Sequence, residues 1–288
     1  MRLCWQSWIN WWQRNWTDRP YQIGTRLHQY EIVHVLGIGS YGIAYLATDQ
    51  TTNQLVVIKQ VKPSLRNQAK GTLSHQYEAH ILATLHHPRI PVLLDQFNTR
   101  DDAFIVMTFF QGISLEEHLF HLKEEWDEQS SVLFMLEIIE IVHYLHTHGI
   151  VHRDIRVPNV VLVDRIPHLI DFGLARYLLP YEKQNLPREI FELSKSENTL
   201  EQEENIEKYH DTASDFYAMG HFFLHLLYSG FSSSVRSEND VDDARSDKSW
   251  QEELSLSSDL TYIINKLLEA EAPYEHIDQL KEDLKALL

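Results

Sequence analysis

Short apolar runs separated by turn residues follow one another along the chain after residue 24. Five of them have the length and the bounding residues of β-strands, at positions 30–36, 43–49, 55–60, 91–97 and 103–109. Between the third and fourth runs, residues 73–85 have helical spacing, and His87-Pro88 stops that helix. The pattern predicts an antiparallel five-strand unit with one main helix.

Beyond Gly112 the apolar positions change to helical spacing. Long amphipathic stretches cover residues 130–148 and 212–228, and shorter ones cover 260–269 and 277–288. Two short strands are expected at 160–163 and 168–170. Residues 232–249 are acidic and Ser-rich, which is typical of a mobile loop. The fold class is therefore α+β, with a sheet unit followed by a mostly helical one.

Residues 1–24 form a Trp-rich extension that holds five of the seven tryptophans. Trp5, Trp8, Trp12 and Trp16 recur at helical spacing, which predicts a helix. Two hypotheses stay open at this point. The helix packs its indoles on the body of the protein, or it docks on a membrane surface or on a protein partner.

Composition excludes some classes of function. The formal net charge of -17 argues against a nucleic-acid partner, which would require a basic face. Cys4 is the single cysteine, so an intrachain disulfide is excluded and a reducing compartment is favoured. A membrane-spanning helix needs about 20 consecutive apolar residues, and the sequence contains no such run. We expect a cytoplasmic protein without a transmembrane segment, and peripheral membrane attachment through the Trp-rich extension stays open.

A glycine-rich turn lies between the first two predicted strands. It contains Gly37, Gly39, Ser40, Tyr41 and Gly42. Glycines let a backbone fold tightly over a polyphosphate and direct N–H groups at it. The same pattern opens a helix in dinucleotide-binding folds, but here a predicted strand follows it.

A lysine ends the third predicted strand, after three apolar residues. This residue is Lys59, and Glu78 lies on the helix that follows. An ammonium group in an apolar cleft must be paired, and a phosphate together with Glu78 would supply its partners.

The most specific signal is a pair of segments in the second half of the chain: Ile150-Val151-His152-Arg153-Asp154-Ile155-Arg156-Val157-Pro158-Asn159 and Ile170-Asp171-Phe172-Gly173-Leu174-Ala175-Arg176. With the glycine turn and the lysine, the chain resembles the protein kinase family, specifically the bacterial serine/threonine kinases related to eukaryotic ones, roughly over residues 24–228. The resemblance implies a two-lobed fold. Residues 25–107 would form the N-lobe, and 108–288 a reduced C-lobe with an acidic loop near 231–250.

The resemblance also implies roles for single residues. Asp154 would orient the substrate hydroxyl, and Asn159 and Asp171 would hold Mg²⁺ or Mn²⁺ against the phosphates of ATP. Lys59, fixed by Glu78, would position the α- and β-phosphates. Arg156 lies where these enzymes usually have a lysine. The positive charge is kept, and a planar guanidinium group replaces an ammonium group.

Further positions follow from the same resemblance. The adenine pocket would contain Ala44, Val57, Met107, Thr108, Phe110 and Val161, with Ala44 and Val57 exchanging the usual large and small residues. Structural and regulatory roles would fall to His152, Arg153, Phe172, Gly173 and Asp215, which we expect to cap its helix and to brace the catalytic loop.

The segment after Gly173 departs from the family. It has no Ala-Pro-Glu motif ahead of Asp215, and Ala272-Pro273-Tyr274 lacks the arginine that usually pairs with that glutamate. Loss of both members of a buried ion pair changes the free energy of folding little, whereas loss of one member is costly. Because both members are missing here, we interpret the departure as a reduced C-lobe. Candidate phosphorylation sites in this region are Ser194, Ser196 and Thr199, where a phosphate could pair with Arg153.

The main hypothesis is an ATP-dependent serine/threonine protein kinase that acts on a protein substrate, its own chain included. Two alternatives stay open: a kinase for a small molecule or lipid on the same scaffold, and a nucleotide-binding scaffold without catalysis. A zinc site among the 17 histidines is rejected, because His152 has a structural role by resemblance and the others lack the recurrent spacing of ligands.

Overall fold

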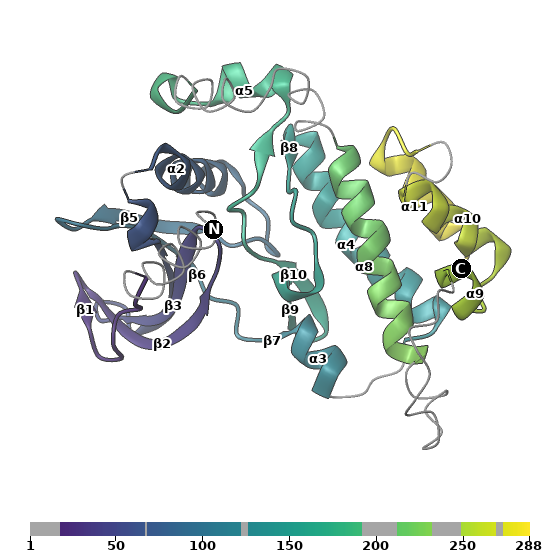
Figure 1. The fold of residues 1–288 in the computed structure, drawn as a ribbon, viewed down its shortest axis with the longest axis horizontal. Helices are drawn as coiled ribbons and strands as arrows, with labels where there is room; N and C mark the ends of the chain where they lie inside the picture. Colours follow the sequence, from purple (N-terminus) through teal and green to yellow (C-terminus); the bar gives the residue numbers. More distant parts are fainter. Residues whose placement is uncertain (1–17, 67, 122–125, 192–211, 232–248, 269–272) are drawn as a thin grey trace, which may run out of the picture. The chain divides into compact units, whose positions relative to one another are not determined.

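The computed structural model describes residues 18–66, 68–121, 126–191, 212–231, 249–268 and 273–288. The chain divides into two compact units (Figure 1). Unit 1 comprises Met1–Phe109 and Lys183–Asn205, and unit 2 comprises Phe110–Glu182 and Ile206–Leu288. None of the helices in the described ranges is long and apolar enough to cross a membrane.

Unit 1 is built on one antiparallel sheet with strand order β1-β2-β3-β4-β6-β5. The strands are β1 Arg26–Leu27, β2 Tyr30–Ile38, β3 Gly42–Asp49, β4 Gln54–Val61, β5 Leu93–Asn98 and β6 Ala103–Thr108. The short helix η1, Pro63–Leu65, and helix α2, Ala69–Thr84, connect β4 to β5. The five predicted strands are confirmed, and the two-residue β1 joins as a sixth that the sequence pattern did not predict.

Alternation along the strands separates the two faces of this sheet. Tyr45, Ile58 and Val106 lie opposite one another on β3, β4 and β6 and belong to the buried apolar core. The opposite face carries Ala44 and Lys59, which are also cross-strand partners. The register that buries the core therefore places the lysine on the other side of the sheet.

Unit 2 is mostly helical (Figure 1). Its two long helices are α4 Glu128–Thr147 and α8 Ala213–Phe231, which pack together through the stacked rings of Phe134 and Phe222. Asp127 caps α4 by accepting a hydrogen bond from the Ser130 amide at 2.8 Å. The other helices are α3 Leu115–His121, α9 Trp250–Glu253, α10 Ser258–Leu267 and α11 Ile277–Lys285, and α5 Leu179–Asn185 runs from unit 2 into unit 1.

Two small sheets complete unit 2. One has the order β10-β9-β7, with β7 Ile113–Ser114, β9 Val160–Val163 and β10 Ile166–Leu169, and the other pairs β8 Ile150–Val151 with β11 Arg176–Tyr177. The short helix η2, Val157–Asn159, precedes β9. The long helices and the β9–β10 hairpin agree with the sequence prediction, whereas β7, β8, β11 and α5 are too short to leave a periodic signal.

Three predictions fall on residues outside the described ranges. They are the Trp-rich helix with Trp5, Trp8, Trp12 and Trp16, the acidic loop, and the phosphorylation sites Ser194, Ser196 and Thr199.

Candidate active site

The glycine-rich turn is the connection between β2 and β3. The Gly39 amide donates to the Gly42 carbonyl at 2.9 Å and closes the hairpin. A side chain at Gly42 would lie 2.9 Å from the Gln60 carbonyl oxygen, so the sheet itself requires glycine there. Nothing lies within 4 Å of a Cβ built on Gly37. Open space above Gly37 is suited to close approach of a phosphate.

Lys59 leaves the sheet on the face opposite the core and pairs with Glu78 on α2. Its Nζ lies 2.7 Å from Oε2 and 2.8 Å from Oε1 of Glu78. The Glu78 side chain is 3% exposed and that of Lys59 is 17% exposed. A pair this far from water holds because each charge satisfies the other. The predicted lysine–glutamate pair is therefore assembled within unit 1.

The same face carries most of the predicted adenine contacts of unit 1. Val57 on β4 lies opposite Met107 on β6, one step along the sheet from the Ala44–Lys59 pair. The Thr108 amide donates at 3.0 Å to the carbonyl of Val92, the residue before β5. Phe110 and Val161, the other predicted contacts, lie in unit 2.

The catalytic-loop residues of unit 2 surround the Asp154 carboxylate. Asn159 donates through Nδ2 to Oδ2 of Asp154 at 2.7 Å and to its backbone carbonyl at 2.9 Å. Arg156 places Nε 3.3 Å from Oδ1. The helix η2 brings Asn159 back onto Asp154, five residues earlier. The carboxylate is thus held from two sides and remains partly accessible.

Asp215 fixes the backbone of this loop from the first turn of α8. Its Oδ2 accepts from the His152 amide at 3.0 Å, and its Oδ1 accepts from the Arg153 amide at 2.7 Å. Arg153 has φ 66°, a strained backbone conformation that these bonds help to maintain. The two bonds to Asp215 come from the loop, whereas a helix cap would accept from its own helix.

A residue that the sequence reasoning missed also contacts Asp215. The Nε2 of His146, near the end of α4, lies 2.9 Å from Oδ2 of Asp215. Burial opposes ionisation of Asp215, but the His146 hydrogen bond and charge, with the loop amides, lower its pKa below the usual value. His146 lies near the end of the predicted helix at residues 130–148. Its spacing from Asp215 gives no signal, because the contact spans 69 residues.

Asp171, Phe172 and His152 form the second motif of unit 2. Asp171 has φ 64°, and its Oδ1 accepts from the Gly173 amide at 3.2 Å. The Phe172 ring is buried and meets the His152 ring edge-on, with centroids 4.8 Å apart. Burial lowers the pKa of His152, against the opposing charges of nearby aspartates. Phe172 thereby fixes the position of the neighbouring Asp171.

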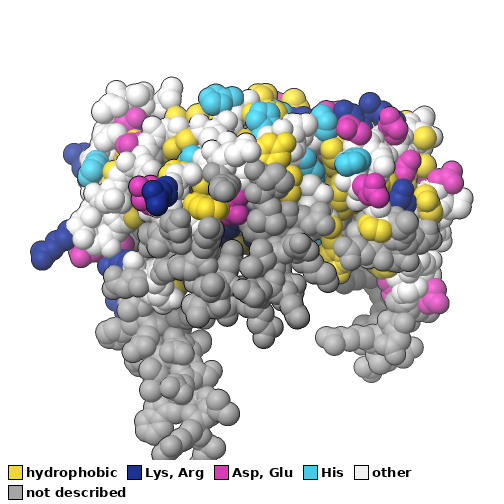
Figure 2. All heavy atoms as spheres, turned by 90° about the horizontal axis from the view of Figure 1, so that it is seen from above, with side chains coloured by type: hydrophobic (Ala, Val, Ile, Leu, Met, Phe, Trp, Pro, Cys, Tyr) yellow, Lys and Arg dark blue, Asp and Glu magenta, His cyan; other side chains and the backbone are white. Residues whose placement is uncertain are grey.

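The donor set of unit 2 suits a hard divalent cation. Asn159 uses its amide nitrogen on Asp154, which leaves its carbonyl oxygen for a ligand, and Asp171 adds an exposed carboxylate. In the part of the chain that the structure describes, no group of three or more His, Cys, Asp or Glu side chains could hold a metal. Histidine side chains lie at several separate places on the face in Figure 2.

Comparison with known proteins identifies the class. Residues 30–274 match the protein kinase domain family. The chain is 34% identical over 268 residues to the probable serine/threonine-protein kinase YbdM of Bacillus subtilis, and this match covers 93% of each protein. It is 28% identical to serine/threonine-protein kinase D of Synechocystis, where the match covers 91% of this chain and 53% of that protein. The chain belongs to the protein kinase family.

Solved structures agree on the fold. The kinase domain of M. tuberculosis PknI aligns with a TM-score of 0.61 at 18% identity, covering 93% of this chain and 98% of that chain. The apo form of PpkA-294 aligns with a TM-score of 0.63 at 24% identity, covering 92% and 99%. The family, the two-lobed fold class and the enzyme class predicted from the sequence are confirmed. The two alternative functions are not favoured.

Proposed function

We propose that this enzyme transfers the γ-phosphate of ATP to serine or threonine hydroxyl groups of proteins, its own chain included, with Asp154 as the residue that orients the hydroxyl and accepts its proton. The supporting observation is the arrangement around Asp154. Asn159 and Arg156 hold one carboxylate oxygen each, and Asp215 fixes the loop that carries all three. A carboxylate held in one orientation is suited to positioning an attacking hydroxyl.

In this proposal Lys59 and Arg156 contact different phosphate groups of ATP. Lys59, with Glu78 holding its ammonium, contacts the α- and β-phosphates. Arg156, which is largely exposed and reaches Asp154 through Nε, places positive charge beside the transferred phosphoryl group. Gly37, Gly39, Ser40, Tyr41 and Gly42 provide the turn that covers the phosphates.

Asn159 and Asp171 would hold a divalent cation, which we propose is Mg²⁺ or Mn²⁺. Bound there, the cation would neutralise charge on the phosphate oxygens. The adenine would lie against Ala44, Val57, Met107 and Val161. The backbone of Thr108 to Phe110 would make the hydrogen bonds to the base.

The test is phosphate transfer from radiolabelled ATP with Mg²⁺, to the protein itself and to generic protein acceptors, with the labelled residues mapped. We expect Asp154→Asn to lower the turnover number by about 10²- to 10⁴-fold, the usual contribution of a general base. Asp164→Asn is the matched control. Asp164 is exposed in the β9–β10 turn with φ 51°, a conformation that asparagine tolerates, so its activity should not change. Equal rates for the two variants would contradict the role of Asp154, and label on residues other than Ser or Thr would contradict the acceptor class.

A further inference from the structure

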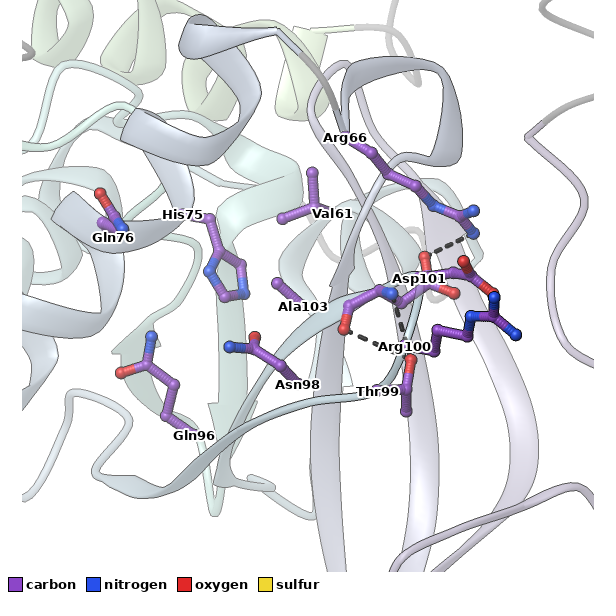
Figure 3. Close-up of a pocket in the computed structure, with 11 residues that line it drawn as sticks. Val61, Arg66, His75, Gln76, Gln96, Asn98, Thr99, Arg100, Asp101 and Ala103 are labelled. Carbon is purple, nitrogen blue, oxygen red and sulfur yellow. Dashed lines mark hydrogen bonds and ion pairs between the residues drawn. The ribbon is translucent and has the colours of Figure 1, made fainter.

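Unit 1 contains a cavity of about 350 Å³ between α2, the end of β4 and the β5–β6 hairpin (Figure 3). Polar or charged side chains form most of its wall, among them His75 and Gln76 of α2 and Asn98 of the hairpin. Among the described residues that line this cavity beside α2, none is a predicted adenine contact. The adenine contacts proposed for unit 2, Phe110 and Val161, lie instead at the β9–β10 hairpin.

The chain lies directly on β9 where it continues from Phe110. The Gly112 amide donates to the Phe110 carbonyl at 3.0 Å, which closes a tight turn. A Cβ on Gly112 would lie 2.9 Å from Cγ1 of Val161 and would overlap the Leu162 carbonyl, so glycine is required for this close approach. The turn therefore fixes the path of the backbone just after Phe110, beside Val161.

The Phe110 side chain packs against a residue of β10. Its ring centroid lies 4.4 Å from that of His168, with an angle of 52° between the two ring planes. His168 is directly opposite Val161 in the antiparallel register of β9 and β10. Side chains of opposed residues lie on the same face of a sheet, about 5 Å apart. Phe110, Val161 and His168 therefore gather on one face of the hairpin.

A hydrogen bond fixes the orientation of the His168 ring. Its Nδ1 lies 3.0 Å from the carbonyl oxygen of Ile166, two residues earlier on the same strand. A carbonyl oxygen can only accept, so Nδ1 carries the proton. The bond restricts rotation of the imidazole and keeps the ring against Phe110.

We propose that His168 is a positioning residue for the adenine of ATP and that it acts through Phe110. This inference rests on the proposed function, in which the backbone of Thr108 to Phe110 bonds the base and Val161 contacts its face. His168 holds the Phe110 ring on the hairpin face that carries Val161. The hinge backbone is thereby kept where one base can reach the hinge groups and Val161 together. A binding group held in place before the ligand arrives loses less entropy on binding.

The role predicts a change in nucleotide affinity without a change in the rate of phosphate transfer. His168→Ala removes the ring on which Phe110 packs, so it should weaken the binding of ADP and of adenosine by the same factor, about five- to tenfold. The factor is shared because the lost support acts on the base. The KM for ATP should rise by a similar factor, with kcat at saturating ATP unchanged. His168→Phe keeps a ring at this position and should bind ADP as wild type does.

His148→Ala is the matched control. The His148 ring centroid lies 4.2 Å from that of Tyr144, and its Nδ1 lies 2.7 Å from the Tyr144 carbonyl oxygen. His148 therefore makes the same two kinds of contact as His168, at the exposed end of α4. Its removal should leave both dissociation constants unchanged. The constants are measured on the full-length chain by isothermal titration calorimetry with ADP and Mg²⁺, and for adenosine by competition, after urea unfolding has shown that each variant is folded.

A double-mutant cycle separates positioning from general destabilisation. In a Phe110→Ala chain, His168→Ala should change the dissociation constant of ADP by less than about twofold, because the ring that it supports is absent. Equal ADP affinity of wild type and His168→Ala would overturn the inference. So would a His168→Phe chain that binds as weakly as His168→Ala, or an undiminished effect of His168→Ala in the Phe110→Ala chain. Failure of the wild type to bind either ADP or adenosine would overturn the proposed function together with this inference.

Discussion

Replacing Asp215 by asparagine tests whether a buried carboxylate holds the catalytic loop. Asp215 has no exposed surface and accepts from the His152 amide, the Arg153 amide and His146. Asparagine keeps one acceptor oxygen and presents an NH₂ group in place of the other. Whichever way the amide is oriented, one buried backbone N–H of the loop faces that NH₂ group. A lost bond to a charged acceptor and an unpaired buried donor together cost about 2–4 kcal/mol.

The assay is urea unfolding with linear extrapolation of the free energy. Asp278→Asn is the control, because Asp278 also faces a histidine, His143, at 3.3 Å, but its side chain is 68% exposed. An exposed pair of this kind contributes about 0–1 kcal/mol. We expect the Asp215 variant to be the less stable by at least about 2 kcal/mol. A difference below about 0.5 kcal/mol would refute the argument that burial and the loop bonds make this carboxylate important.

The pH dependence provides a second check on Asp215. Its pKa is lowered in the folded state, so its charge stabilises the fold above the unfolded value, near 3.8, and that contribution is lost as the pH falls through the lower folded value. The stability difference between wild type and Asp215→Asn should therefore be constant above about pH 5 and shrink only below about pH 4.

Two further perturbations concern unit 1 and unit 2 separately. Burial lowers the pKa of His75 from 6.5 to about 4 in the folded state, so between these pH values the unfolded chain binds a proton at His75 that the folded chain does not. Acidification over this range should therefore lower the free energy of unfolding of wild type by up to about 3 kcal/mol more than that of His75→Phe. The control His86→Phe should show the same dependence of stability on pH as wild type. Gly112→Ala should lower the free energy of unfolding by about 2 kcal/mol or more, because its Cβ would overlap the Leu162 carbonyl. Gly37→Ala should change the free energy of unfolding little, because nothing lies within 4 Å of a Cβ at that position. Equal effects of the two substitutions would show that the backbone relaxes around Gly112.

The sequence predicted the parts of the site that local chemistry determines. Lys59 and Glu78 could be assigned because a strand and the next helix must meet within a small unit. Asp154 and Asn159 were assigned from the resemblance to the kinase family, and in the structure one short turn brings them together. The strand alternation that buries Tyr45 and Ile58 also dictated the face on which Lys59 leaves the sheet.

Contacts between residues that lie far apart in the sequence could not be predicted from it. His146 reaches Asp215 only because α4 and α8 pack side by side, and the sequence gives no register for that packing. The cavity beside α2 was hidden for the same reason. His75 and Gln76 read as polar positions of an amphipathic helix, and their burial depends on the β5–β6 hairpin that packs over them.

The C-terminal departure from the family has a physical account at Tyr274. In place of an arginine that would need a buried carboxylate, the chain buries this tyrosine, whose ring lies 6.0 Å from that of Phe216 on α8. The Tyr274 hydroxyl donates to Asp283 at 2.8 Å, and the Lys266 ammonium lies 3.9 Å from the ring centroid. The hydroxyl and the ring face are thus satisfied by charged groups nearer the surface. An aromatic ring therefore packs against α8 at this position, and this contact helps to hold the helix whose first turn carries Asp215.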